Sequence, residues 1–215
     1  MGANKFFFSQ VRKGLNLIAD YQFNNNLIDD ITGDALTGIN VAYDNNRLVL
    51  NGLNTKVNKF DSEELNRFSF TDGVRDLPFK IEMSVQFDEF NRIQFLASKR
   101  DNGTTDCEWQ INFNNTSNSI DVVLFSGGIN TDRILKGCVI TPNINTIYDI
   151  VVTYDGNGIN GLNMIVDGVD ADTKSEIGNY DKMVKTNSDF AIGKASWVDL
   201  YQYNGKIDYL KIYKW

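Results

Sequence analysis

The chain of 215 residues contains no histidine, and this absence limits the chemistry open to it. Histidine is the commonest general base and the commonest metal ligand of proteins, so Ser-His-Asp and Cys-His catalytic groups are excluded. Two cysteines, Cys107 and Cys138, cannot complete a Cys₄ zinc site, and a Cys₂His₂ site is impossible. Carboxylates and aromatic side chains remain as candidate functional groups.

Three aspartates are candidate ligands of a structural calcium ion: Asp29, Asp30 and Asp208. Asp208 shares a predicted strand face with Leu210 and Ile212, so its side chain is expected to point partly inward. A buried carboxylate must be paired or hydrogen-bonded. Asp208 either caps backbone amides where the two termini meet or binds calcium beside Asp29 or Asp30, because calcium prefers hard oxygen ligands. No other cofactor is expected.

Four aromatic residues lie off the alternating pattern of the chain and are candidates for ligand binding. They are Trp109, Tyr180, Trp197 and Tyr201. The C–H faces of sugar rings pack well against such π surfaces, so each of them is a candidate platform for a sugar. Ordinary packing inside the protein is the alternative for all four.

The elements that must position these residues are β-strands, because apolar and polar residues alternate over most of the chain. Between residues 80 and 87 every second side chain is apolar, which places one face on a core and the other in water. Asn-Gly pairs, which suit tight turns, separate many of the segments. Further strands are predicted at residues 17–23, 48–50, 94–98, 108–112, 120–125, 133–139, 190–192 and 207–213.

The spacing of the two cysteines gives a prediction about their oxidation state. The predicted strands at 108–112, 120–125 and 133–139 follow one another and are expected to pair as a meander. Cys107 and Cys138 then flank a middle strand, about 10 Å apart at the usual interstrand spacing, beyond the reach of a disulfide. Both are expected to be free thiols.

Length and charge narrow the class of protein further. Hydrophobic residues form 42% of the chain, enough to fill the core of one large β domain. The net charge of −7 disfavours nucleic acid as a partner, since binding it needs a basic surface. No apolar run approaches the roughly 18 residues of a transmembrane helix, so membrane insertion is not expected. No signal peptide is recognised, because the apolar stretch from Phe6 to Phe8 is too short.

Seven short segments stand in an order and spacing similar to those of a known family. They are residues 17–24 (LIADYQFN), 47–52 (RLVLNG), 77–85 (LPFKIEMSV), 148–156 (YDIVVTYDG), 163–168 (NMIVDG), 190–193 (FAIG) and 203–213 (YNGKIDYLKIY). Together they resemble laminin-G-like domains, which belong to the concanavalin A-like lectin and glucanase jelly rolls. The resemblance spans residues 15–215 and leaves residues 1–14 as an N-terminal arm. It implies an all-β, two-sheet antiparallel jelly-roll sandwich and frequent carbohydrate binding or cell-surface adhesion.

The same fold hosts glycosidases, so catalysis has to be weighed. Those enzymes place paired carboxylates on one strand, as in the pattern E-x-D-x-x-E. The nearest candidates are Glu82, Asp88, Glu89, Asp106 and Glu108, and none of them has that spacing. The sequence therefore predicts a protein that binds without catalysing a reaction.

The favoured function is a recognition or adhesion module for a glycan or a cell-surface receptor. The expected location is a virion or the extracellular space, for example as a capsid decoration, fibre or receptor-binding protein of a phage or other virus. Residues 1–14 would then contact a virion protein partner, since they hold three consecutive phenylalanines. The alternatives are an exported bacterial carbohydrate-binding module and a glycoside hydrolase of the same fold.

Overall fold

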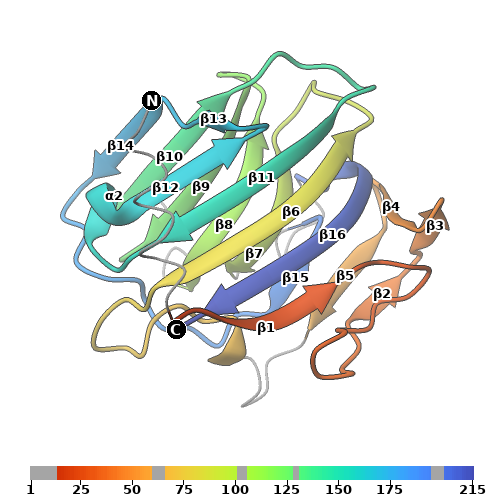
Figure 1. The fold of residues 1–215 in the computed structure, drawn as a ribbon. Helices are drawn as coiled ribbons and strands as arrows, with labels where there is room; N and C mark the ends of the chain where they lie inside the picture. The colour runs from red at the N-terminus through yellow and green to blue at the C-terminus, as the bar shows by residue number, and fades with distance from the viewer. Residues whose placement is uncertain (1–13, 60–65, 101–105, 128–130, 195–200) are drawn as a thin grey trace.

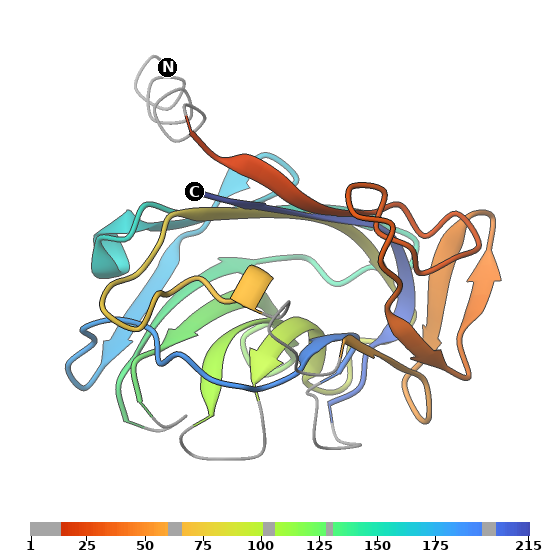
Figure 2. The same ribbon diagram turned by 90° about the horizontal axis from the view of Figure 1, so that it is seen from below.

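The computed structural model describes residues 14–59, 66–100, 106–127, 131–194 and 201–215. Two antiparallel sheets of eight strands each lie face to face as two layers (Figures 1 and 2). The described ends of the chain lie side by side, because the first strand pairs with the last and Asn16 stands opposite Lys214. The predicted fold class, an all-β jelly-roll sandwich, is confirmed.

The first sheet carries the long strands that follow the apolar alternation most clearly. Its members are β1 (Asn16–Tyr21), β3 (Ala42–Asp44), β4 (Arg47–Asn51), β6 (Phe79–Phe87), β11 (Ile147–Tyr154), β12 (Leu162–Val166), β13 (Val169–Asp170) and β16 (Asn204–Lys214). Their order is β13-β12-β11-β6-β16-β4-β3, with β1 also paired to β16. A short helix, α2 (Gly158–Gly161), leads into β12.

The second sheet contains the meander that the sequence predicts. Its members are β2 (Thr37–Ile39), β5 (Lys56–Lys59), β7 (Gln94–Arg100), β8 (Cys107–Asn114), β9 (Ser119–Phe125), β10 (Arg133–Val139), β14 (Thr173–Ile177) and β15 (Phe190–Ile192). Their order is β14-β10-β9-β8-β7-β15-β5-β2, so β7 to β10 are neighbours in sequence and in space.

The core lies between the two sheets because each strand turns its apolar face inward. Ile81 and Met83 of β6 and Ile111 and Phe113 of β8 are fully buried in one hydrophobic cluster. Since side chains alternate along a strand, the residues between them must lie on the outer faces of the sandwich. On β8 those residues are polar, and they form part of the site described below.

Both cysteines are free thiols in the structure, as predicted. Cys107 lies on β8 and Cys138 on β10, with β9 between them. Cys138 packs in the main core, whereas Cys107 packs in a separate small cluster with Val123 and Phe125. The two thiols therefore lie on opposite faces of the same sheet.

Asp208 does not share the inward face of Leu210 and Ile212 as expected, and a β-bulge explains why. The pairing of β16 with β6 shifts register between Ile207 and Tyr209, so Asp208 has no partner opposite it. Such an extra residue reverses which face the following side chains occupy. Leu210 and Ile212 point into the core, while the Asp208 side chain is 32% exposed.

Among the described residues, no helix is long and apolar enough to cross a membrane. Residues 1–13 of the expected N-terminal arm lie outside the described part of the chain.

Candidate functional site

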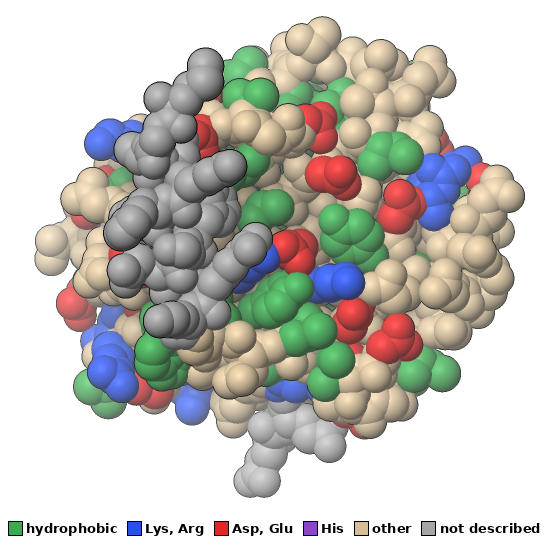
Figure 3. Space-filling view, viewed as in Figure 1, with side chains coloured by type: hydrophobic (Ala, Val, Ile, Leu, Met, Phe, Trp, Pro, Cys, Tyr) green, Lys and Arg blue, Asp and Glu red, His purple; other side chains and the backbone are tan. Residues whose placement is uncertain are grey.

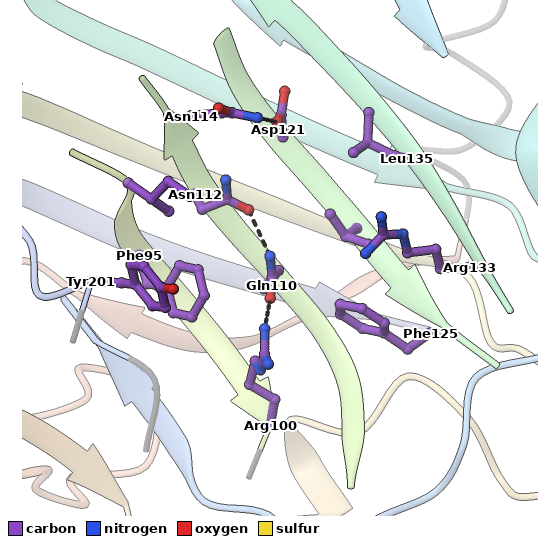
Figure 4. Close-up of a pocket in the computed structure, with 12 residues that line it drawn as sticks. Phe95, Arg100, Gln110, Asn112, Asn114, Asp121, Phe125, Arg133, Leu135 and Tyr201 are labelled. Carbon is purple, nitrogen blue, oxygen red and sulfur yellow. Dashed lines mark hydrogen bonds between the residues drawn. The ribbon is translucent and has the colours of Figure 1, made fainter. Parts of the chain in front are cut away.

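The outer face of the second sheet holds a hollow of about 360 Å³. Strands β7 to β10 form its floor, and Tyr201 lies at one side beside Phe95 (Figure 4). The lining residues are Ile93, Phe95, Arg100, Gln110, Asn112, Asn114, Asp121, Val123, Phe125, Arg133, Leu135 and Tyr201. A volume of this size falls at the lower end of the usual range for small-molecule sites in proteins.

A row of polar side chains runs along β8 through the middle of the hollow. Gln110, Asn112 and Asn114 alternate with the core residues of this strand, so they share its outer face. Gln110 Nε2 donates a hydrogen bond of 2.8 Å to Asn112 Oδ1, and Arg100 donates to Gln110 Oε1 (Figure 4). Gln110 and Asn112 are only 8% and 5% exposed. These amides are therefore fixed in orientation but lie deep in the hollow.

Asp121 of β9 lies at the end of the hollow that is farthest from Arg100 (Figure 4). Its oxygens accept hydrogen bonds from Ser119 Oγ at 2.6 Å and Asn114 Nδ2 at 3.4 Å. Burial raises the pKa of this carboxyl above its ordinary value, and these two hydrogen bonds only partly oppose that rise. Gly137 on β10 leaves the space that the carboxylate occupies, since a Cβ there would come within 2.5 Å of Asp121 Oδ1.

Two aromatic rings form one side of the hollow. The centroids of Phe95 and Tyr201 lie 5.5 Å apart, and Tyr201 is 41% exposed. Tyr201 has a φ of +63°, in the left-handed region that large L-residues rarely adopt. Backbone strain of this kind concentrates at functional sites, where the surrounding structure holds the side chain in place. Tyr201 therefore presents a partly exposed ring to the hollow from a strained backbone position.

Arginines and apolar residues complete the hollow. The Arg100 guanidinium lies over the rings of Phe95 and Phe125, at 5.3 and 5.7 Å from their centroids. Burial lowers the pKa of Arg100, a contact with Cys107 opposes this, and the positive charge of Arg133 acts in the same direction as burial. Below them, the small cluster around Cys107 and Phe125 supplies an apolar floor.

The structure assigns Trp109 a role different from the expected one. Trp109 is fully buried in the core, where its ring packs against Phe70 and Phe190. Its indole Nε1 donates a hydrogen bond of 2.9 Å to the carbonyl of Phe68. A ring with no exposed surface cannot stack on a sugar, so the expectation for Trp109 is corrected to a structural role. Along β8, Trp109 alternates with the outward-facing Gln110 and Asn112, and this alternation indicates that the Trp109 side chain points inward.

Tyr180 is half-buried at the edge of the core, away from the residues that line the hollow. Its hydroxyl donates a hydrogen bond of 2.6 Å to Asp76 Oδ2, which also accepts from Tyr154 at 2.7 Å. Asp76 Oδ1 accepts from the backbone N–H of Met183. Burial raises the pKa of the Tyr180 hydroxyl, and the Asp76 carboxylate raises it further. Tyr180 thus fastens the segment before β15 to the sandwich. Trp197 lies outside the described residues.

Two of the three candidate calcium ligands, Asp29 and Asp208, are paired with arginines, and the three do not form one group. Asp29 is fully buried, with Oδ1 accepting from the amide of Asp20 and Oδ2 lying 3.0 Å from the Arg67 guanidinium. Asp208 lies 3.5 Å from Arg47 Nε, and Asp30 is exposed. Within the described part of the chain, no group of three or more His, Cys, Asp or Glu residues is placed to hold a metal ion.

Of the three aromatic candidates that the structure describes, Tyr201 is the one that lines the hollow. The amides of β8, Asp121 and the two arginines were not identified from the sequence. On β8 and β9, alternation with core residues marks the amides and Asp121 as outward-facing. An outward-facing polar residue is, however, ordinarily solvated.

Comparisons with known proteins agree with this architecture. No curated protein matches the chain. Domain 4 of AbnA, an extracellular arabinanase from Geobacillus stearothermophilus in complex with arabinotriose, has a similar structure with a TM-score of 0.58. It is 17% identical, and the match covers 93% of each chain.

Two larger proteins contain a similar fold. Trypanosoma rangeli sialidase, in complex with sialic acid, is 14% identical with a TM-score of 0.63, and the match covers 94% of this chain and 31% of the sialidase. Botulinum neurotoxin type C, whose cell entry depends on two ganglioside molecules, is 13% identical with a TM-score of 0.61. The match covers 96% of this chain and 49% of the toxin chain. At these identities the likeness shows the fold alone.

The family assignment comes from the sequence itself. Residues 77–214, more than half of the chain, match a laminin-G-type family described as the concanavalin A-like lectin/glucanases superfamily. This region contains the strands that form the hollow, β7 to β10. The chain therefore belongs to the concanavalin A-like lectin/glucanases superfamily.

Proposed function

We propose that the protein is a non-catalytic recognition module that binds a glycan in the hollow of the second sheet. One observation carries the proposal: buried amides with fixed orientation lie beside the exposed ring of Tyr201, whose backbone has a positive φ. Sugars present hydroxyl groups that need paired donors and acceptors, and C–H faces that pack on rings. Gln110 and Asn112 offer the first kind of contact, and Tyr201 with Phe95 offers the second.

The known ligands of similar structures support this class of ligand. The arabinanase domain holds arabinotriose, and the neurotoxin depends on gangliosides. These are properties of those proteins, and the proposal extends their class of ligand, carbohydrate, to this chain.

The charge of the hollow supports binding without hydrolysis. Glycoside hydrolases of the ordinary kind use two carboxyl groups on either side of the scissile bond. Among the described residues that line the hollow, Asp121 is the only carboxylate. Asp121 accepts hydrogen bonds from Ser119 Oγ and Asn114 Nδ2, which favours a structural role for it.

Substitution of Tyr201 tests the proposal. A glycan array followed by isothermal titration calorimetry should identify a ligand of the wild-type protein. Tyr201→Asn, which keeps a residue that tolerates positive φ, should raise its Kd about tenfold through loss of ring packing. Tyr209→Asn, at a tyrosine of β16 on the other sheet, should leave Kd unchanged. Equal affinity of the two variants would contradict a binding site in the hollow.

The same ligand tests the absence of catalysis. Incubation with the protein should release no reducing sugar. Release that disappears in Asp121→Asn would show a hydrolase and overturn the non-catalytic part of the proposal.

We further propose a location for the protein and a role for its N-terminal residues. The protein acts as a virion or extracellular component, with residues 1–14 contacting a virion protein partner and the hollow facing a cell-surface glycan. Deletion of residues 1–14 should abolish attachment to particles while leaving Tm and glycan affinity unchanged. If the deletion lowers Tm instead, these residues belong to the fold, and an exported carbohydrate-binding module becomes the better description.

A further inference from the structure

Charge is distributed unevenly along the hollow. Arg100 of β7 and Arg133 of β10 extend into it from two sides near Phe125, while Asp121 and Asn114 occupy the opposite end (Figure 4). The chain as a whole carries a net charge of −7. The described lining residues of the hollow include two guanidinium groups and one carboxylate. Positive groups therefore outnumber negative ones in the hollow, whereas the chain as a whole is negative.

Arg100 is held in a way that keeps its charge deep in the hollow. It is 6% exposed, donates to Gln110 and lies over two aromatic rings. A guanidinium taken out of water loses hydration, so such groups are kept where planar oxyanions have to be recognised. The pKa of Arg100 is lowered first by this burial and also by the positive charge of Arg133. Both guanidinium groups line the hollow on the side of Phe125 (Figure 4).

An anion placed in the hollow between the two arginines would be attracted by both of them. Carboxylate and sulfate oxygens match the fork of N–H donors on arginine, and charge-assisted hydrogen bonds are about twice as strong as neutral ones. At the other end of the hollow, the carboxylate of Asp121 repels a second anion. The distribution of charge therefore fixes which end of a ligand can be negative.

We propose that the hollow selects a sugar bearing a negative group, bound between Arg100 and Arg133, with its hydroxyls along Gln110, Asn112 and Asp121. This inference rests on the proposed glycan-binding function and names the class of ligand within it. Carboxylate and sulfate are the two sources of the charge, and the aromatic pair of Phe95 and Tyr201 packs against the sugar ring in either case.

A matched set of oligosaccharides tests the charge directly. The array should hold neutral oligosaccharides beside carboxylated and sulfated versions of the same backbones, such as lactose with its sialylated and sulfated forms, and galacturonic acid trisaccharide with its methyl ester. We expect the bound glycans to be anionic. Methyl esterification keeps the shape and removes the charge, so it should raise the Kd of a carboxylated ligand at least about tenfold.

Two variants locate the charge in the protein. Arg133→Gln, at the less buried arginine, should raise the Kd for the anionic ligand about tenfold and change the Kd for its neutral form less than about twofold. Arg100→Lys keeps the positive charge but removes the planar pair of N–H donors of the guanidinium. It therefore tests the geometry of anion binding without removing a buried cation. Arg75→Gln is the matched control, because Arg75 is exposed and lies outside the hollow. Melting curves of all three variants separate loss of binding from loss of fold.

The outcomes distinguish the two proposals. Binding of neutral glycans alone, or anionic binding that survives both esterification and Arg133→Gln, would overturn the charge selection and leave the glycan-binding proposal standing. Preference for sulfated over carboxylated ligands, or the reverse, supports the inference and identifies the anion. Wild-type protein that binds no member of the set, neutral or anionic, would overturn both.

Discussion

The two outer faces of this sandwich are built from the same alternation but differ in the partners of their charged side chains. On the first sheet, charges lie in pairs near the surface: Lys206 with Asp44 at 2.5 Å, Lys211 with Asp20 at 3.5 Å and Arg47 with Asp208 at 3.5 Å. Figure 3 shows this face, with acidic and basic side chains side by side between apolar ones. On the second sheet, polar groups lie deep in a hollow, and Asp121 has neutral hydrogen-bond partners.

The two faces differ in how a carboxylate is solvated and how readily it ionises. A carboxylate beside a lysine at the surface keeps its charge easily, and the pKa of Asp44 is lowered by its hydrogen bond to Lys206. A carboxylate buried among amides resists ionisation, and the pKa of Asp121 is raised by burial. Sites that bind are commonly less stable than they could be, because their groups are arranged for a partner.

Gly137→Ala should have the largest effect of the variants that test this difference. The added Cβ would lie within 2.5 Å of Asp121 Oδ1, so the Asp121 side chain would have to move away from its hydrogen bonds to Ser119 and Asn114. We expect a loss of about 1–3 kcal/mol in the free energy of unfolding, measured by urea denaturation. The double variant Gly137→Ala/Asp121→Ser should recover much of it, since the shorter side chain clears the space. Unchanged stability in the single variant would mean that Asp121 moves aside freely.

Asp121→Asn and Asp44→Asn should change stability in opposite directions. Because the folded pKa of Asp121 is raised, its contribution to stability is present below the ordinary pKa of 3.8 and is lost as pH rises through the folded value. Asp121→Asn should therefore stabilise the protein at pH 7, by about 0.5–2 kcal/mol, and the gain should vanish in acid.

For Asp44 the sign is reversed. Its folded pKa is lowered, so its contribution is present above the ordinary pKa and disappears as pH falls through the folded value. Asp44→Asn should slightly lower Tm at pH 7 and match the wild type in acid. Melting curves of Asp121→Asn and Asp44→Asn between pH 3 and pH 8 test both expectations. Changes in Tm of the same sign at pH 7 would contradict the difference between the two faces.

Lys211→Met should have the smallest effect. Its ion pair with Asp20 joins two strands at the surface, where such pairs contribute about 0–1 kcal/mol. We expect a change below about 0.5 kcal/mol in urea denaturation, and a smaller one still in 0.5 M salt. A loss as large as that expected for Gly137→Ala would show that the first face is as tightly organised as the hollow.

The fold was predictable because alternation is a local property of the sequence. The period of two in residues 80–87 corresponds to β6, and the predicted strands at 108–112, 120–125 and 133–139 correspond to β8, β9 and β10. What alternation cannot supply is the effect of one inserted residue. The bulge at Asp208 reverses the inside and outside of β16 between Ile207 and Leu210, and the residue types alone do not reveal it.

The candidate site was predictable only in part, because a sequence pattern gives the face of a strand and not the curvature of the sheet. Gln110 and Asp121 are polar residues on outward positions, where solvated side chains are the ordinary expectation. Their burial depends on how the sheet curves and on what lies across the hollow, and Tyr201, which lines the same hollow, is distant in sequence. Tyr201 was identified because an aromatic residue off the pattern has no obvious place in the core, and the same argument failed for Trp109.

The two buried thiols lie on opposite faces of the second sheet, so their rates of alkylation report separately on those two faces. Cys107 lies under the hollow with Val123 and Phe125, so an alkylating reagent reaches it only when that floor opens. Cys138 Sγ lies 3.8 Å from the Val169 carbonyl and is reached when β10 parts from β13. If a ligand fills the hollow as proposed, we expect it to slow labelling of Cys107 and to leave the rate at Cys138 unchanged. Mass spectrometry of the unmodified sequence can thus follow binding at one face with the other as its reference.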